Sequence, residues 1–403
     1  MRRTETQVDV PPVEELLPQV EAAPEVDAGA QWDLTVTRND RVEYWIRFLQ
    51  TRNREKTRLW LERSGRYMPM IQRELRARNM PQDLVYLALI ESGFSPRAYS
   101  RAHAVGIWQF IAETGRRYGL EISPYVDERR DPIAATRAAL DYLQDLYRRF
   151  GSWYLAAAAY NTGENRVERI LRQRLGVTRG HDSLFWKIDQ YLPRETRDYV
   201  PLMLAAAHIA KEPEKYGFRN LRYHAPLEFE TVQVPGSVSL AAAAKAAEVS
   251  ADVVRDLNPH LVRGMTPPGR TWTLRIPRGR RDVFAHNFSR MPPEERLAMV
   301  HHTVRRGETL SHIAVRYGTT VEALRAANGW IHPRRLRVGQ RLRVPASRRV
   351  QVAASARVHR VRRGDTLWEL ARRYGVTVSQ LRAWNGLGRS SRIFPGQRLR
   401  IAP

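Results

Sequence analysis

The chain has 403 residues, a length that can hold two to four domains. It contains no cysteine, which excludes disulfide frameworks, thiolate catalysis, Cys-ligated metals and an acylated cysteine within these residues. The formal net charge of +25 predicts an attraction to polyanions, such as nucleic acid or an anionic wall or membrane surface.

Residues 1–39 are predicted to be a disordered or linker segment. The first thirty are acidic, include several prolines and contain no aromatic residue. They lack the charged-then-apolar pattern of a secretory signal, so no export signal is recognisable in them. The longest apolar runs of the chain, at 153–160 and 199–210, are too short to cross a bilayer, and we expect no transmembrane helix.

Residues 40–220 predict an α-helical domain. Stretches at 83–90, 134–150 and 153–160 are apolar or carry apolar residues at helical spacing, and Gly or Pro separates them. Long β-rich runs are absent from this region. Its length suits a single hydrophobic core.

Glu91 is the candidate catalytic acid of this domain. Pro81 suits the first turn of a helix whose residues 84–90 are almost all apolar, and Glu91 follows them directly. In dry surroundings the pKa of such a carboxyl rises, and it can hold a proton near neutral pH. A general acid that protonates a glycosidic oxygen needs this property. Judged on this stretch alone, a Glu91 that caps the helix or forms a salt bridge with a neighbour is an equally good explanation.

Three further motifs follow Glu91-Ser92 in chain order, and Ser100 lies between Ser92 and the first of them. They are Gly106-Ile-Trp-Gln109, Ala159-Tyr-Asn161 and Glu195-Thr-Arg-Asp-Tyr199-Val200. Together they resemble the family 1 soluble lytic transglycosylase domain, whose landmarks are Glu-Ser, Gly-Leu-Met-Gln, Ala-Tyr-Asn and Glu-Thr-Arg-x-Tyr-Val. The resemblance covers about residues 75–205 and implies a lysozyme-like domain that acts on peptidoglycan glycan strands. His103 and Asn165 replace common glycines of the family, which concerns loop geometry rather than chemistry.

The resemblance implies that Glu91 is the sole acid and base. It would protonate the oxygen between N-acetylmuramic acid and N-acetylglucosamine, then accept the proton of the muramic C6 hydroxyl, whose attack on C1 leaves a 1,6-anhydro end. Because the substrate supplies the nucleophile, we expect no second carboxylate, metal or cofactor. Substrate-binding or supporting roles are implied for Ser92, Ser100, Trp108, Gln109, Tyr160, Asn161 and Tyr199.

Structural interpretations of these side chains stay open. Tyr160, Tyr199 and Trp108 also suit core packing, and Ser92 suits a helix end. The other acidic residues of this region are expected at the surface or as helix caps; they are Glu113, Asp127 and Asp131.

A duplicated unit occupies the C-terminal region. Val304-Arg-Arg-Gly-Glu-Thr-Leu310 recurs as Val361-Arg-Arg-Gly-Asp-Thr-Leu367, at an offset of 57 residues that the other matches share. Each unit, 302–345 and 358–401, predicts a strand, two helices and a closing strand, with 346–357 as a linker. These motifs resemble the LysM domain, which implies that N-acetylglucosamine-containing glycan binds between the first helix and the second strand.

A degenerate LysM-like module is expected upstream, at residues 225–280. It follows the same order of landmarks but has lost the Gly-Asp/Glu-Thr-Leu turn, so glycan binding by this copy stays open. Residues 281–301 are expected to be a linker. The predicted fold class is therefore multidomain: an α-helical lysozyme-like catalytic domain followed by small α+β (βααβ) LysM modules.

The predicted function is that of a peptidoglycan lytic transglycosylase, held by its LysM modules to the wall in the periplasm or cell envelope. Peripheral membrane or wall association stays open. The alternatives are a goose-type lysozyme-like hydrolase on the same scaffold and a non-catalytic peptidoglycan-binding scaffold. Residues 302–403 hold 22 arginines against four acidic residues, but without a nucleic-acid motif we expect only nonspecific, salt-dependent DNA binding.

Overall fold

The computed structural model describes most of the chain beyond residue 30. The described ranges are 31–267, 270–296, 299–317, 320–329, 331–332, 336–345, 358–361, 365–374, 376–387 and 393–401. Residues 1–30 of the predicted N-terminal segment 1–39, and the whole predicted linker 346–357, lie outside them. Two compact units divide the chain: one runs to Phe229 and includes Asn258–His260, and the other comprises Glu230–Leu257 and the residues from Leu261 onward. Across the described ranges, no helix is long and apolar enough to cross a membrane.

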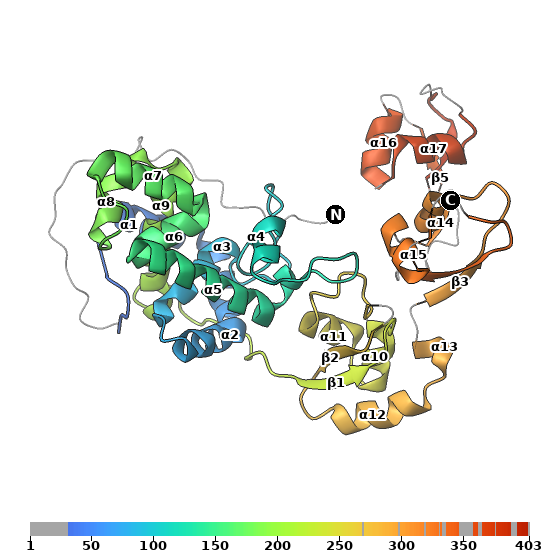
Figure 1. Cartoon of the computed structure of the whole chain (residues 1–403), viewed down its shortest axis with the longest axis horizontal. Helices are drawn as coiled ribbons and strands as arrows, with labels where there is room; N and C mark the ends of the chain where they lie inside the picture. The colour runs from blue at the N-terminus through green and yellow to red at the C-terminus, as the bar shows by residue number, and fades with distance from the viewer. Residues whose placement is uncertain are drawn as a thin grey trace. The chain divides into compact units, whose positions relative to one another are not determined.

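The first unit is helical, as predicted (Figure 1). Its apolar residues recur at helical spacing and give each long helix one buried face. The α-helices are α1 (Asp40–Gln50), α2 (Arg54–Ala77), α3 (Val85–Ser92), α4 (Ala112–Arg117), α5 (Pro132–Phe150), α6 (Trp153–Thr162), α7 (Glu164–Leu175), α8 (Ser183–Ile188) and α9 (Arg194–Lys211). Short 3-10 turns are η2 (Gln82–Leu84), η3 (Glu128–Arg130) and η4 (Asp189–Tyr191).

Local sequence signals set the ends of these helices. The Asp131 carboxylate caps α5 by accepting bonds from the amides of Ile133 and Ala134, and Pro132 takes the first helical position. Gly151, at φ +69°, ends α5 in the left-handed conformation. Ser152 then caps α6 through the amide of Leu155. The predicted helices at 134–150 and 153–160 therefore begin and end within two residues of the observed ones.

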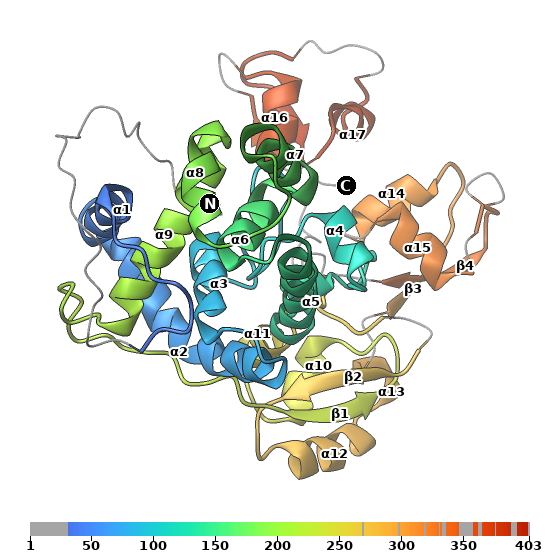
Figure 2. The same cartoon turned by 60° about the vertical axis from the view of Figure 1, so that its left-hand side comes forward.

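Helix α3 lies inside the first unit and packs against α9 and α2 (Figure 2). Its sequence, Val-Tyr-Leu-Ala-Leu-Ile-Glu-Ser, is apolar on every side, and residues 85–89 are all buried. A helix that is hydrophobic all round belongs in a core. This position places the end of α3, and Glu91 with it, among the surrounding helices.

Residues 31–39 were expected to belong to a disordered or linker segment, but they are packed on the helical unit. The amide of Asp33 donates to the Asp83 carboxylate, and the amide of Asp83 donates to the Asp33 carboxylate, both at 2.9 Å. Lys211 lies 2.5 Å from the Asp83 carboxylate, and Leu34 is buried. Burial raises the pKa of Asp83, and the Lys211 bond opposes that rise. Hydrogen bonds to Asp83 and an apolar contact hold this segment in place.

The second unit begins with a small α+β module. Strands β1 (Glu230–Val234) and β2 (Trp272–Ile276) pair antiparallel, with Glu230 opposite Ile276. Helices α10 (Leu240–Ala246) and α11 (Ala251–Leu257) lie between them in the chain. Residues 281–301 were expected to be a linker, but α12 (Arg281–Arg290) and α13 (Pro293–Arg296) form within that range. Helix α12 packs on α10 and buries Phe284, an apolar contact that a linker would not have.

Each duplicated unit has the βααβ order that the sequence predicts. The first consists of β3 (Met299–Thr303), α14 (Leu310–Arg316), α15 (Val321–Ala327) and β4 (Arg341–Pro345). The second consists of β5 (Val358–Arg360), α16 (Leu367–Tyr374), α17 (Val378–Trp384) and β6 (Arg398–Arg400). Both pairs of strands are antiparallel, and each module has its own small apolar core.

Candidate active site

Glu91 lies in the last turn of α3 and is partly buried. Gly93 ends the helix in the left-handed conformation, at φ +57°. A Cβ at position 93 would lie 1.9 Å from the Trp60 ring, so glycine is needed both for its backbone freedom and for space. The sharp end of α3 thus comes two residues after Glu91.

The Glu91 carboxyl has the properties of a general acid. Burial raises its pKa to about 7, and the charge of Glu195 acts in the same direction. The Tyr199 hydroxyl donates to Glu91 Oε1 at 2.5 Å and opposes that rise. A carboxyl with a pKa near 7 can donate a proton at neutral pH and take one back afterwards.

Tyr199 comes from α9, more than a hundred residues after Glu91 in the chain. Its side chain is buried, and burial beside the Glu91 charge raises the pKa of Tyr199 well above its ordinary value. The phenol therefore stays protonated and donates its hydrogen bond to Glu91. Tyr199 thus occupies the core and contacts the Glu91 carboxyl at the same time.

The sequence motif Gly106-Ile-Trp-Gln109 forms a tight turn beside α3. Ser92 Oγ donates to the carbonyl of Ile107 at 2.8 Å, and the Tyr160 hydroxyl donates to the carbonyl of Trp108 at 2.8 Å. Gln109 has φ +48°, which is rare for a residue with a side chain, and its Nε2 donates to the carbonyl of Gly106. The side chains at positions 92 and 160 thus fasten this turn.

The structure assigns packing roles to two of the predicted substrate-binding residues. Trp108 is fully buried and its Nε1 donates to Thr136 Oγ1 at 2.9 Å, so it does not offer a face to a sugar. Ser100 is buried, and its hydroxyl accepts the amide of Ala104 at 3.1 Å, which closes a local turn. These positions correct the expectation for Trp108 and place Ser100 in support of the loop.

Asn161 lies in the last turn of α6, and its side chain bonds to residues at the start of α9. Its Oδ1 accepts from Thr196 Oγ1 at 2.6 Å, and its Nδ2 donates to Glu195 Oε1 at 3.4 Å. Glu195 is exposed and was not among the predicted site residues. A signal for it was present, because Glu195 and Tyr199 are four residues apart and share one face of a helix.

A row of tyrosines continues from Tyr160. The Tyr160 and Tyr142 rings are 5.2 Å apart between centroids, and the Tyr142 and Tyr118 rings are 5.0 Å apart. The Tyr142 hydroxyl donates to Glu164 at 3.2 Å, and Arg117 pairs with the same carboxylate at 3.3 Å.

In the part of the chain that the structure describes, no group of three His, Asp or Glu residues could hold a metal ion.

Family comparisons cover most of the chain. The transglycosylase SLT domain matches residues 68–179, and the LysM domain matches 302–345 and 359–402. The LysM-like domain of lytic transglycosylase MltD matches residues 228–292. The duplicated C-terminal units and the helical unit thus each have a family counterpart.

The chain is also similar to individual proteins. Membrane-bound lytic murein transglycosylase D of Escherichia coli (strain K12) is 33% identical over 389 residues, which cover 93% of this chain and 84% of that protein. A putative tributyltin chloride resistance protein of an Alteromonas species is 43% identical over 115 residues, covering 28% of this chain and 56% of that protein. A solved structure of an inactive variant of the lytic transglycosylase Slt from Pseudomonas aeruginosa is 28% identical, covers 38% of this chain and 25% of that one, and has a TM-score of 0.29.

The fold class predicted from the sequence is confirmed, as is the activity. Glu91 and the motifs at 106–109 and 159–161 lie within the matched SLT domain, and the duplicated units are LysM domains that bind the cell wall. With this site, these domains and the relative from Escherichia coli that spans nearly its whole length, the chain belongs to the family of membrane-bound lytic murein transglycosylase D, the peptidoglycan lytic transglycosylases that carry LysM modules.

Proposed function

We propose that Glu91 carries out both proton transfers of the lytic transglycosylase reaction. It donates its proton to the oxygen that joins C1 of N-acetylmuramic acid to C4 of N-acetylglucosamine, and the bond between C1 and that oxygen breaks. The Glu91 carboxylate then takes the proton of the muramic C6 hydroxyl, whose oxygen forms the new bond to C1. Glu91 is regenerated, no water is consumed, and the products are a free 4-hydroxyl and a 1,6-anhydro end.

The observation that supports this role most directly is the environment of Glu91. Burial raises the pKa of this carboxyl to about 7, so protonated and ionised forms are both populated at neutral pH. Tyr199 donates to Oε1, which leaves Oε2 to carry the proton. A fixed donor on one oxygen also holds the carboxyl in a single orientation.

Gln109 and Asn161 are proposed to orient the sugars by hydrogen bonds. Gln109 belongs to the turn beside Glu91, and both side chains are partly exposed. Ser92, Ser100 and Tyr160 act through the loops they fasten, because their hydroxyls are engaged by main-chain atoms. Trp108 contributes by packing.

For the LysM modules we propose N-acetylglucosamine-containing glycan as the ligand. The second module has two exposed aromatic side chains that suit the face of a sugar: Trp368, at the start of α16, is 63% exposed, and Phe394, before β6, is 61% exposed. The corresponding residues of the first module, 57 positions earlier, are Ser311 and Arg337. We therefore expect the second module to bind glycan more strongly than the first.

We also propose that the protein acts in the periplasm or cell envelope, where peptidoglycan lies. The formal net charge of +25 suits peripheral association with an anionic wall or membrane surface. Fractionation of cells, with this chain followed by antibody, tests the location directly.

The test of the reaction is mass spectrometry of purified peptidoglycan digested by the wild-type chain and by Glu91→Gln. We expect wild-type products that end in 1,6-anhydro-muramic acid, lighter by one water than reducing ends, and a loss of rate on the order of 10²–10⁴-fold in the variant. Reducing ends would identify a hydrolase of the goose-lysozyme type. Binding to sacculi without cleavage would identify a scaffold.

A further inference from the structure

Arg129 is a buried arginine to which the reaction described above assigns no role. It lies in η3, its side chain is 9% exposed, and that of its neighbour Asp127 is 12% exposed. The sequence predicts a surface or cap role for Asp127. The Asp127 carboxylate does accept the amide of Arg129 as a cap, but it lies inside the protein and binds the guanidinium as well.

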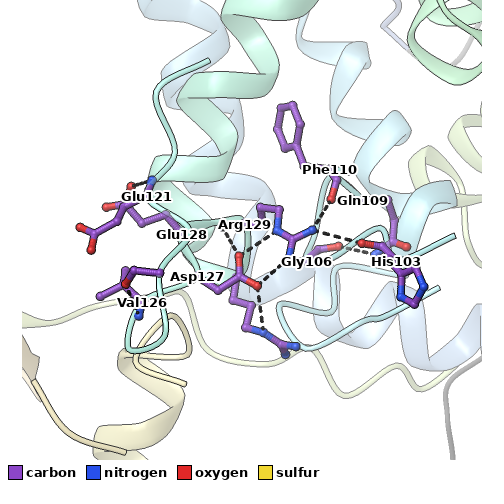
Figure 3. Close-up of polar contacts among 11 residues, drawn as sticks. His103, Gly106, Gln109, Phe110, Glu121, Val126, Asp127, Glu128 and Arg129 are labelled. Carbon is purple, nitrogen blue, oxygen red and sulfur yellow. Dashed lines mark hydrogen bonds and ion pairs between the residues drawn. The ribbon is translucent and has the colours of Figure 1, made fainter. Parts of the chain in front are cut away.

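The Asp127 carboxylate holds the Arg129 guanidinium in one orientation. Arg129 Nε donates to Asp127 Oδ1 at 2.9 Å, and Arg129 Nη2 donates to Oδ2 at 2.9 Å (Figure 3). This two-point geometry is specific to arginine, because its five donors are fixed in a planar fork. The remaining nitrogen, Nη1, is thereby aimed away from the carboxylate.

Nη1 binds both ends of the turn 103–110, which contains the motif Gly106–Gln109 of the candidate active site. It donates to the carbonyl of His103 at 3.1 Å and to the carbonyl of Phe110 at 3.2 Å (Figure 3). The main chain of Arg129 touches the middle of the same turn, since a Cβ on Gly106 would lie 1.7 Å from the Arg129 carbonyl oxygen. The turn 103–110 is thus shaped around Arg129 at three points.

This turn needs external support because its backbone is strained. His103, Gly106 and Gln109 all have positive φ angles, of +61°, +85° and +48°. Two of the three carry side chains that disfavour this conformation, and such residues persist where their surroundings hold them. Arg129 supplies that hold on one side of the turn. Ser92 and Tyr160 supply it on the side of Glu91, through the carbonyls of residues 107 and 108.

We propose that Arg129 and Asp127 are positioning residues of the transglycosylase reaction. The ion pair keeps the turn 103–110 in the conformation that presents Gln109 to the sugar, and it acts through Gln109 without touching the substrate. The proposal rests on the roles proposed above for Glu91 and Gln109. Arg130, the next residue, is the matched control, since it lies 3.9 Å from Asp127 Oδ2 and makes none of the bonds to the turn described here.

The test uses the full chain and purified soluble glycan strands. Arg129→Lys keeps the charge but lacks the fork, so kcat is expected to fall at least tenfold while the thermal transition stays above the assay temperature. Arg130→Lys is expected to keep kcat within about twofold. The limb of the pH profile that reports Glu91 should stay in place in both variants, and binding to sacculi should be unchanged.

A double-mutant comparison decides whether the pair acts through Gln109. In a Gln109→Ala background, Arg129→Lys should cause little further loss of kcat; losses that multiply would overturn the proposal, as would wild-type kcat in Arg129→Lys. If Arg129→Lys does not fold, Asp127→Asn replaces it, with a severalfold loss expected and an unchanged kcat overturning the idea. Failure of the role of Glu91 is separate, because Glu91→Gln would then still release anhydro ends.

Discussion

At the scale of single residues, the pKa of Glu91 follows from opposing neighbours. Burial and the charge of Glu195 raise it, and the hydrogen bond from Tyr199 lowers it. The carboxyl must be protonated to act as the acid, so activity is lost as the pH rises through its pKa. The opposite effects of Tyr199 and Glu195 on the pKa of Glu91 can therefore be tested separately.

Tyr199→Phe and Glu195→Gln should move the alkaline limb of the kcat profile in opposite directions. The phenylalanine removes the bond that lowers the pKa of Glu91, so its limb shifts to higher pH. The glutamine removes a negative charge that raises the same pKa, so its limb shifts to lower pH. The measurement is kcat on soluble glycan between pH 5 and about 9. Shifts of the same sign would show that Glu91 does not govern this limb.

At the scale of elements, helix α3 depends on its final glycine. Position 93 has φ +57°, and a side chain there meets the Trp60 ring. Gly119 offers a comparison within the same unit, because it has φ +82° but no atom within 4 Å of an added Cβ. The two positions separate backbone cost from steric cost.

Gly93→Ala is expected to destabilise the protein by about 2–5 kcal/mol, from left-handed strain together with overpacking. Gly119→Ala should cost about 1–2 kcal/mol, from the backbone conformation by itself. Urea unfolding followed by circular dichroism measures both. Equal losses in the two variants would mean that the Trp60 ring moves aside without cost.

The LysM modules give a second prediction at this scale. Trp368→Ala should weaken binding of N-acetylglucosamine oligomers by about 1 kcal/mol, or roughly fivefold in Kd, because an aromatic face against the sugar is lost. Ser311→Ala, at the same place in the first module, should leave Kd unchanged. Titration calorimetry on the full chain measures both. An unchanged Kd in Trp368→Ala would move the glycan site away from the first helix of the second module.

At the scale of the whole molecule, catalysis and wall binding reside in separate units. The SLT domain matches residues 68–179, and the LysM domains begin at residue 302. A weak glycan contact on a tether raises the local concentration of substrate for the catalytic unit. Insoluble wall should benefit from this effect far more than short soluble glycan.

Deletion of residues 302–403 should reduce binding to sacculi and slow the digestion of insoluble wall, by roughly tenfold or more at low enzyme concentration. Activity on short soluble glycans should survive within about twofold, because the helical unit has its own core. Sedimentation with sacculi and release of soluble products measure the two effects. Equal losses on both substrates would show that the C-terminal modules stabilise the catalytic unit.

The sequence by itself determined the helical unit and the duplicated βααβ modules, and it singled out Glu91 as the candidate acid. The helices and strands depend on signals that lie close together in the chain, such as apolar spacing and capping residues. The duplication follows from an offset of 57 residues, and the choice of Glu91 follows from motifs spread over residues 91–200. A helix start such as Asp131-Pro132 needs only its own neighbours, which is why the predicted and observed helices agree closely.

The tertiary structure decided the contacts that join distant segments. Tyr199 hydrogen-bonds to Glu91, 108 positions away in the chain, and the Arg129 guanidinium hydrogen-bonds to the turn that begins at His103. Trp108 proved to be core and residues 31–39 proved to be packed, since burial depends on what the rest of the fold places around a side chain. Local patterns carry no information about such neighbours, because packing and desolvation are properties of the assembled molecule.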